Sequence, residues 1–228
     1  MKAKGSNFNS QRGFSLVELL IVIMIIGIMG AIIGLSFRAP KLYNAENQAL
    51  RLIDLIREAQ QSSLTQKNTM RVEINATRRV IRLINENTAT TAGDDVLVKS
   101  FPYTPLNAST GDNSVFFGVT PTNMTTTPVE VVPIDPIAFA NSTHPLSLGE
   151  QVATLRFRKD SAVLSAGSNA IGTGAIPTGA TIYVWTRRAS EINNVAEVLR
   201  AVTVSGSSGS TKLWKCGVIN NQCTTWTK

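Results

Sequence analysis

Residues 12–35 read RGFSLVELLIVIMIIGIMGAIIGL, and this stretch is the most informative part of the chain. A basic leader ends at Gly13. Phe14 then begins an apolar run that continues to Phe37 and contains one acid, Glu18. A carboxylate near the start of a membrane helix is costly to bury, so Glu18 is a functional candidate. An ordinary single-pass anchor also has a basic flank and an apolar span, but it would gain nothing from this acid.

The segment resembles the class III signal of type IV prepilins and type II secretion pseudopilins. The resemblance implies that a membrane prepilin peptidase cuts after Gly13 and that the new amino terminus at Phe14 is methylated. Glu18 then becomes the fifth residue of the mature chain, where the family keeps a glutamate. A secretory signal instead ends its apolar core with a small-residue cleavage site. We therefore expect residues 1–13 to be a cleaved leader and residues 14–37 to remain as a transmembrane and filament-core helix.

The charge of the leader predicts the orientation of this helix. The net charge of the chain is +7, of which Lys2, Lys4 and Arg12 contribute three, so removal of a leader without acids leaves +4. Basic flanks stay on the cytoplasmic side of a membrane. We expect a single-pass protein of the bacterial inner membrane whose remaining chain is periplasmic or otherwise extracytoplasmic.

Beyond Pro40, which lacks the N–H donor of a helix interior, the pattern becomes amphipathic. Apolar residues recur mostly at steps of three and four, with charged residues on the other face. This predicts a helix over residues 38–68 that packs on a domain along one face. Residues 69–228 are expected to form a β-rich globular domain. Within it, residues 104–145 are rich in Thr, Asn, Ser and Pro and are expected to be a variable surface insertion.

Alternating and β-branched residues predict the strands of this domain. Residues 70–74 and 79–84 are expected to pair as a hairpin, and so are residues 198–205 and 211–216 across a glycine-serine turn. Shorter strands are expected over residues 115–119, 129–132, 155–158 and 181–185.

Two cysteines near the C-terminus, Cys216 and Cys223, have six residues between them. In an oxidising compartment they can close a small loop, and free thiols are the other interpretation. Two cysteines and the single histidine, His144, are too few for a structural zinc site.

The order of these elements resembles the H-type minor pseudopilins of type II secretion and the FimT-type minor pilins. The resembling segments are LRFRKDSAVLSA, GATIYVW and LRAVTVSGSSGSTKLWKC, at residues 155–166, 179–185 and 199–216. The resemblance implies an α+β, type IV pilin-like fold, in which a long N-terminal membrane helix packs on an antiparallel β domain. It also implies a subunit near the tip of a type II secretion pseudopilus or a type IV pilus. Its expected partners are prepilin peptidase, other pilins or pseudopilins, the inner-membrane assembly platform and membrane lipid.

Burial of the apolar helix among neighbouring helices would leave Glu18 without a partner. The positive amino terminus of a neighbour, at its own Phe14, is the obvious counter-charge, so we expect the pair to set the register of assembly. A tolerated acid near the lipid headgroups is the other interpretation.

Enzymatic chemistry has little basis in the sequence. A Ser-His-Asp or Cys-His arrangement would depend on His144, which we expect at the surface in a loop. Phosphate-binding glycine motifs and calcium-binding EF-hand patterns are missing, so Asp94, Asp95 and Asp112 are expected to be solvated loop acids. We expect no enzyme activity, no cofactor and no bound metal.

DNA binding in natural transformation is the alternative function. Some FimT-type minor pilins bind DNA through a basic C-terminal motif of the GRxR kind. The equivalent turn here, residues 209–212, reads GSTK and lacks the paired arginines. An ordinary solvated face is therefore the other interpretation. The candidate basic and aromatic surface consists of Lys212, Lys215, Arg200, Arg187, Arg188, Trp214 and Trp226.

Overall fold

The computed structural model describes residues 16–36, 39–86, 95–103, 115–118, 120–130, 134, 136–159, 163–166, 179–187, 195–220 and 222–228. The chain divides into two compact units, residues 1–40 and residues 41–228. An N-terminal helix is followed by a β-rich domain with two antiparallel sheets, which is an α+β architecture.

The helix of the first unit is α1 (Leu16–Ser36), with Glu18 in its first turn. Residues 16–27 are all exposed, and all except Glu18 are apolar or glycine. Within the part of the chain that the structure describes, no helix is both long and apolar enough to cross a membrane.

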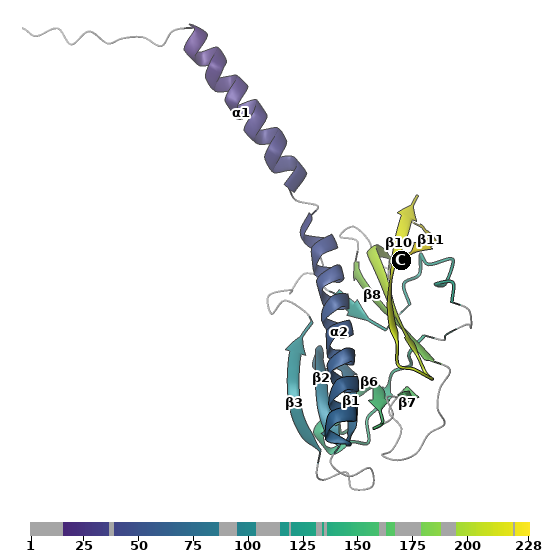
Figure 1. Ribbon diagram of the computed structural model, residues 1–228. Coiled ribbons are helices and arrows are strands. Elements are labelled where there is room, and N and C mark those ends of the chain that lie inside the picture. Colours follow the sequence, from purple (N-terminus) through teal and green to yellow (C-terminus); the bar gives the residue numbers. More distant parts are fainter. Residues whose placement is uncertain are drawn as a thin grey trace, which may run out of the picture. The chain divides into compact units, whose positions relative to one another are not determined.

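The second unit contains most of α2 (Ala39–Gln66), the amphipathic helix. Pro40 lies in its first turn, where the missing N–H donor costs no helical hydrogen bond. The apolar residues at three- and four-residue steps are buried: Ala45, Ala49, Leu52, Ile53, Ile56 and Ala59. Figure 1 shows α2 lying along β1 and β2.

The first sheet has the strand order β3-β2-β1-β6-β5, and β7 also pairs with β6. Its central hairpin pairs Thr69 with Glu86 and Asn75 with Val80, close to the bounds that the alternation predicts. The strands are β1 (Thr69–Asn75), β2 (Val80–Glu86), β3 (Val96–Pro102), β5 (Ala140–Asn141), β6 (Gln151–Phe157) and β7 (Val163–Ala166).

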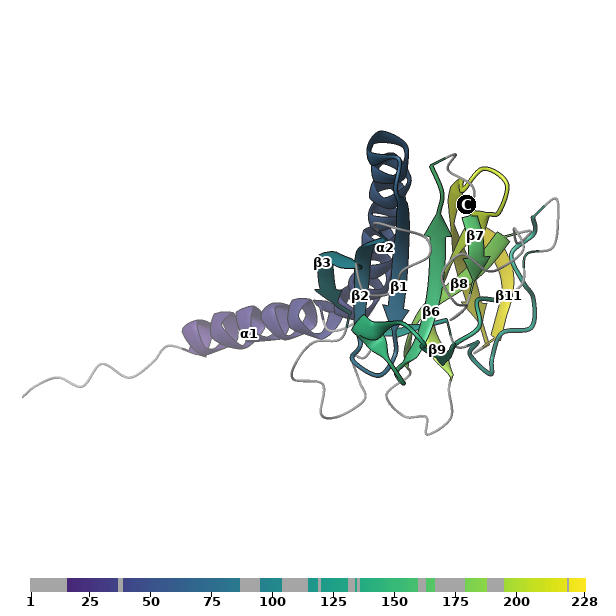
Figure 2. The same ribbon diagram turned by 90° about the horizontal axis from the view of Figure 1, so that it is seen from below.

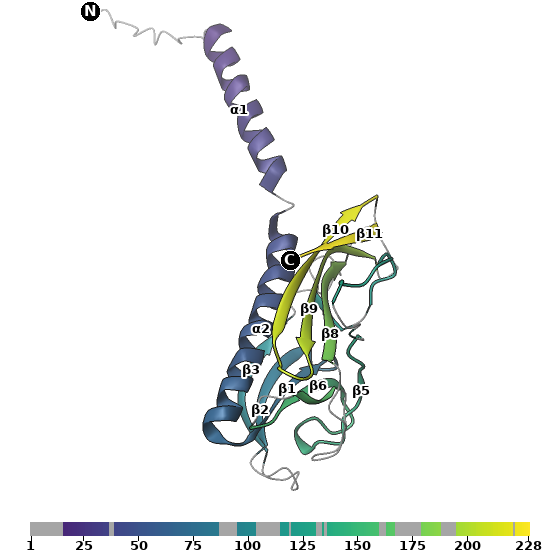
Figure 3. The ribbon, with the colours of Figure 1, turned by 45° about the vertical axis from the view of Figure 1, so that its right-hand side comes forward.

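The second sheet has the order β11-β10-β9-β8-β4, and Figure 3 shows its yellow C-terminal strands beside β8. The predicted hairpin of the last third is present, with Thr211 opposite Val204 and Lys215 opposite Arg200. The strands are β4 (Val115–Phe117), β8 (Gly179–Arg187), β9 (Ala196–Ser205), β10 (Thr211–Ile219) and β11 (Gln222–Thr227).

One hydrophobic core joins α2 to both sheets. It contains Val72 and Leu155 of the first sheet, Ile182 and Val202 of the second, and the buried face of α2. Figure 2 places α2 beside β1 and the second sheet beyond β6. A second cluster, with Trp185 and Leu199 at its centre, lies on the other face of the second sheet.

Some of the described residues between 115 and 150 are built into the domain, whereas the variable insertion over residues 104–145 stays a prediction. Phe117 and Ile137 are 3% and 4% exposed and belong to the main core. Residues 120–130 are bonded along the second sheet, because the Thr125 amide and hydroxyl both donate to the Cys223 carbonyl. Residues 136–150 cover the first sheet, as described below. A composition rich in Thr and Ser is compatible with such covering segments because hydroxyl groups such as those of Thr125 and Ser147 bond to groups of the sheets.

Candidate functional site

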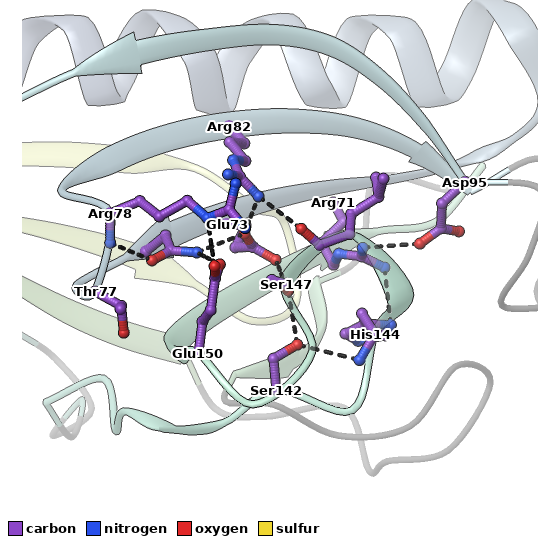
Figure 4. Close-up of polar contacts among 12 residues, drawn as sticks. Arg71, Glu73, Thr77, Arg78, Arg82, Asp95, Ser142, His144, Ser147 and Glu150 are labelled. Carbon is purple, nitrogen blue, oxygen red and sulfur yellow. Dashed lines mark hydrogen bonds and ion pairs between the residues drawn. The ribbon is translucent and has the colours of Figure 1, made fainter.

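The first sheet has a polar face that is buried. Side chains alternate along a strand, so the residues between the apolar core positions of β1, β2 and β6 point away from α2. Five of these residues are charged, yet each of the five is at most 7% exposed: Arg71, Glu73, Arg82, Glu86 and Arg156. Residues 142–150 and Asp95 supply their partners from outside the sheet (Figure 4).

The Arg71 cluster is defined as Arg71, Glu86, Asp95, His144 and Arg156, and its side chains are buried. Arg71 donates from Nη1 to Glu86 Oε1, and from Nη2 to Asp95 Oδ2 at 2.8 Å. Arg156 donates from Nε to the same Glu86 oxygen at 2.9 Å. Burial lowers the pKa of Arg156 and the nearby Glu86 carboxylate opposes that shift. Two cations and two carboxylates thus neutralise each other where an unpaired charge would be costly.

His144 closes this cluster from the covering segment. It is 1% exposed, so the expectation of a surface histidine was wrong. Its Nδ1 lies 3.2 Å from Arg71 Nη1 and its Nε2 lies 2.9 Å from Arg156 Nη2. A guanidinium only donates, and a neutral imidazole has one acceptor nitrogen, so the ring accepts from one of the two arginines.

The three potential metal ligands in this cluster already contact the Arg71 guanidinium. One ligand atom each of Glu86, Asp95 and His144 lies within 4.8 Å of the others. Arg71 contacts all three residues, and its guanidinium therefore supplies the cation that these groups surround. The side chain of Asp95 is 1% exposed, which corrects its interpretation as a solvated loop acid. Asp94 and Asp112 lie outside the described residues.

A second set of contacts fastens the same covering segment. Ser147 Oγ donates to Glu73 Oε2 at 2.8 Å, and Arg82 Nη1 donates to the Leu146 carbonyl at 3.0 Å. Glu150 accepts from Asn75 Nδ2 at 2.5 Å and from Arg78. The segment is thus held by charge-assisted hydrogen bonds, which are stronger than neutral ones.

The candidate DNA-binding cations face acids of the same chain. Lys212 Nζ lies 2.5 Å from Glu130 Oε2. Lys215 Nζ lies 2.7 Å from Glu46 Oε1, and Arg200 Nη2 lies 3.3 Å from Glu46 Oε2. Arg200 is 6% exposed. Each of the three cations is therefore paired with a glutamate of the same domain, and Arg200 is also buried.

The two tryptophans of that candidate surface also form hydrogen bonds within the domain. The indole N–H of Trp214 donates to Glu130 and to Thr203, and that of Trp226 donates to the Thr126 carbonyl. The Arg187 guanidinium lies 5.0 Å from the centre of the Phe116 ring. Arg188 lies outside the described residues.

The contacts of Glu46 with Lys215 and Arg200 should make the stability of the domain depend on pH. The hydrogen bond from Lys215 lowers the pKa of Glu46 against the opposing effect of burial, and Arg200 adds to the lowering. A folded-state pKa below the unfolded value gives stability that is present above about pH 4.5 and is lost as the pH falls through the folded-state pKa. The free energy of unfolding of wild type should therefore exceed that of Glu46→Gln at pH 7, and the gap should narrow toward pH 3. Urea titrations at both pH values measure it, and a constant gap would contradict the assignment.

The C-terminal cysteines lie on two paired strands of the second sheet. The structure joins Cys216 of β10 to Cys223 of β11 by a disulfide, with Cα atoms 5.9 Å apart. Cys223 is fully buried, and its amide donates to the Asn123 carbonyl at 2.9 Å. The bonded hairpin thus also holds residues 123–125 against the second sheet.

Three candidate site residues lie near the N-terminus. Glu18 is on α1 and is exposed, whereas Gly13 and Phe14 lie outside the residues that the structure describes.

Residues 8–34 match the model of the prokaryotic N-terminal methylation motif. Comparison with curated proteins gives no match, and comparison with solved structures gives none either. The motif indicates a substrate of prepilin processing of the type IV pilin or pseudopilin kind. It implies processing by prepilin peptidase and assembly with other pilin subunits.

Proposed function

We propose that the protein is a non-enzymatic minor pilin or pseudopilin of the H or FimT type. It is cleaved after Gly13, methylated at Phe14 and assembled near the tip of a type II secretion pseudopilus or a type IV pilus. The observation that carries the proposal is the methylation motif over residues 8–34, which includes the exposed apolar stretch 16–27 of α1.

The surface of α1 supplies the driving force for this assembly. Leu16, Val17 and Ile23 are 80%, 65% and 61% exposed, and the other large apolar side chains up to Ile26 are similarly open. Burial of each such side chain stabilises by roughly 1.5–3 kcal/mol. A helix that is apolar all round requires lipid or other helices. We propose that lipid covers it before assembly and that neighbouring subunits cover it afterwards.

Membrane orientation follows from the leader. Lys2, Lys4 and Arg12 keep the amino end cytoplasmic, so the β domain lies on the outer side of the inner membrane. A disulfide between Cys216 and Cys223 fits that oxidising compartment.

Glu18 sets the register in this proposal. Its carboxylate, in the first turn of α1, pairs with the positive amino terminus at Phe14 of a neighbouring subunit. The pair forms at one axial offset between two parallel helices, so it determines how far each subunit is lifted from the membrane. A buried charge without its partner is strongly unfavourable.

Substitution of Glu18 by Gln tests this role. The variant should be processed like wild type but should assemble at least about tenfold less efficiently, because loss of one partner of a buried ion pair costs about 3–5 kcal/mol. The fraction of chain recovered in sheared filaments or in cross-linked subunit ladders measures assembly. Asp54→Asn is the matched control, since it neutralises an exposed acid of α2. Normal assembly of Glu18→Gln would show that the proposed register is wrong.

A further inference from the structure

The disulfide between Cys216 and Cys223 is buried inside the domain. Cys216 is 9% exposed and Cys223 is fully buried. Both belong to the second hydrophobic cluster, together with Trp185 and Trp214. Thiol–disulfide exchange requires a thiolate to reach a sulfur atom of the bond directly. The folded domain therefore withholds this bond from thiols in the surrounding solution.

A short segment beside β11 completes this burial. We call residues 123–126 the strap. The Cys223 amide donates to the Asn123 carbonyl at 2.9 Å, and the Thr125 amide and hydroxyl donate to the Cys223 carbonyl at 3.2 and 2.8 Å. Met124 forms a parallel bridge with Cys223 and packs against the same hydrophobic cluster. At Cys223, β11 thus has β10 on one side and the strap on the other.

The strap is also fastened to groups other than the cysteines. The Asn123 side chain exchanges two hydrogen bonds with the backbone of Ala196 in β9, each at 2.9 Å. The indole N–H of Trp226 donates to the Thr126 carbonyl at 2.9 Å. Release of the strap breaks this small set of contacts, and such local opening is separable from unfolding of the whole domain.

The chemistry of disulfide formation requires the strap to be open. A disulfide donor first forms a mixed disulfide with one cysteine, and the second cysteine then displaces the donor. The bond between the two sulfurs of the donor breaks, the bond between Cys216 and Cys223 forms, and the two thiol protons pass to the donor sulfurs. The cysteines are thereby oxidised and the donor is reduced. A mixed disulfide carries the bulk of the donor on a side chain that has almost no free surface in the closed domain.

We propose that a disulfide donor oxidises Cys216 and Cys223 before the strap docks on β11, and that the docked strap then shields the bond from thiol reductants. The location of this donor on the extracytoplasmic side rests on the proposed function. The shielding rests on the domain alone.

The first test measures reduction of the native bond in the full-length chain, purified in detergent from its own cells. Dithiothreitol is added without denaturant, and the thiols that appear are trapped by alkylation and counted by mass. The wild-type bond should be reduced at least about 100-fold more slowly than the same bond in urea, because the reductant must wait for the strap to open.

Substitution of Asn123 by Ala releases the strap and keeps both cysteines. The variant should be reduced at least about tenfold faster than wild type, because both hydrogen bonds to Ala196 are lost. Asn141→Ala is the matched control. Asn141 is an exposed asparagine of the first sheet whose side chain accepts a hydrogen bond from Gln151, and its variant should be reduced at the wild-type rate.

The second test examines the order of the two events. Cells that make wild type or Asn123→Ala are lysed in an alkylating reagent, so that any free thiol is trapped at that moment. The two chains should contain the same fraction of disulfide, because oxidation precedes docking of the strap.

Reduction of the wild-type bond as fast as in urea would overturn the shielding, and so would reduction of Asn123→Ala at the wild-type rate. Free thiols in Asn123→Ala at lysis would show that oxidation needs the docked strap, which overturns the order. Thr125→Val, which removes the hydroxyl bond to Cys223, replaces Asn123→Ala if that variant does not accumulate. A chain that keeps residues 1–13 and has a shielded bond contradicts the proposed function alone.

Discussion

Replacement of Gly13 by valine is expected to abolish removal of the leader, so that the chain accumulates at its full length of 228 residues. Glycine leaves the backbone before Phe14 without a side chain, whereas valine places a stiff β-branched group next to the peptide bond that is cut. Wild type should run as the shorter, processed form. Immunoblots of cells that contain prepilin peptidase measure the proportion of the two forms.

Gly5→Val is the matched control, because it makes the same change in the leader but outside the matched residues 8–34. It should be processed like wild type. Efficient processing of Gly13→Val, or equal loss with both substitutions, would contradict cleavage after Gly13.

The second large effect concerns the Arg71 cluster. Arg71→Met should lower the free energy of unfolding by about 3–5 kcal/mol, because it leaves the buried Glu86 and Asp95 carboxylates without their shared cation. Urea titration of the purified chain in detergent, followed by tryptophan fluorescence, to which the buried Trp185 contributes, measures this loss.

Arg78→Met provides the control for Arg71. The Arg78 side chain is 56% exposed and also pairs with a glutamate, Glu150. Exposed pairs contribute about 0–1 kcal/mol, so the control should remain close to wild type. A loss with Arg71→Met that is no larger than with Arg78→Met would show that the cluster does not hold the domain together.

Two hairpins of the domain could be predicted from the sequence because the pattern that indicates them lies within one short segment. Alternation over residues 70–84 and the glycine-serine turn after residue 205 predict hairpins whose partners are close in the chain, and the structure has both. β3 and β11 were not predicted. β3 is apolar on both sides and has no alternation, and the short β11 is defined by its pairing with β10.

The buried polar face was not predicted, for a physical reason. An alternating pattern such as Leu155-Arg156-Phe157 is the same for a face in water and for a face covered by polar loops. The partner of Arg156, His144, comes from a loop that composition alone assigns to the surface. Similarly, Lys212 appears as part of a free basic surface until the structure shows Glu130, which lies 82 residues away in the chain. Long-range ion pairs leave no local signal.

The N-terminal candidate residues could be predicted for a different reason. Gly13, Phe14 and Glu18 come from a linear motif that an enzyme reads as sequence, so the pattern carries the information without a fold. The match over residues 8–34 supports that interpretation. The role of each residue remains a proposal about processing and assembly.

The most direct measurement is the intact mass and amino-terminal sequence of the wild-type chain isolated from its cells. The isolated chain should begin at Phe14, lack residues 1–13 and carry one methyl group on its terminal nitrogen. A chain that begins at Met1, or that is cut on the far side of the apolar segment, would contradict this expectation.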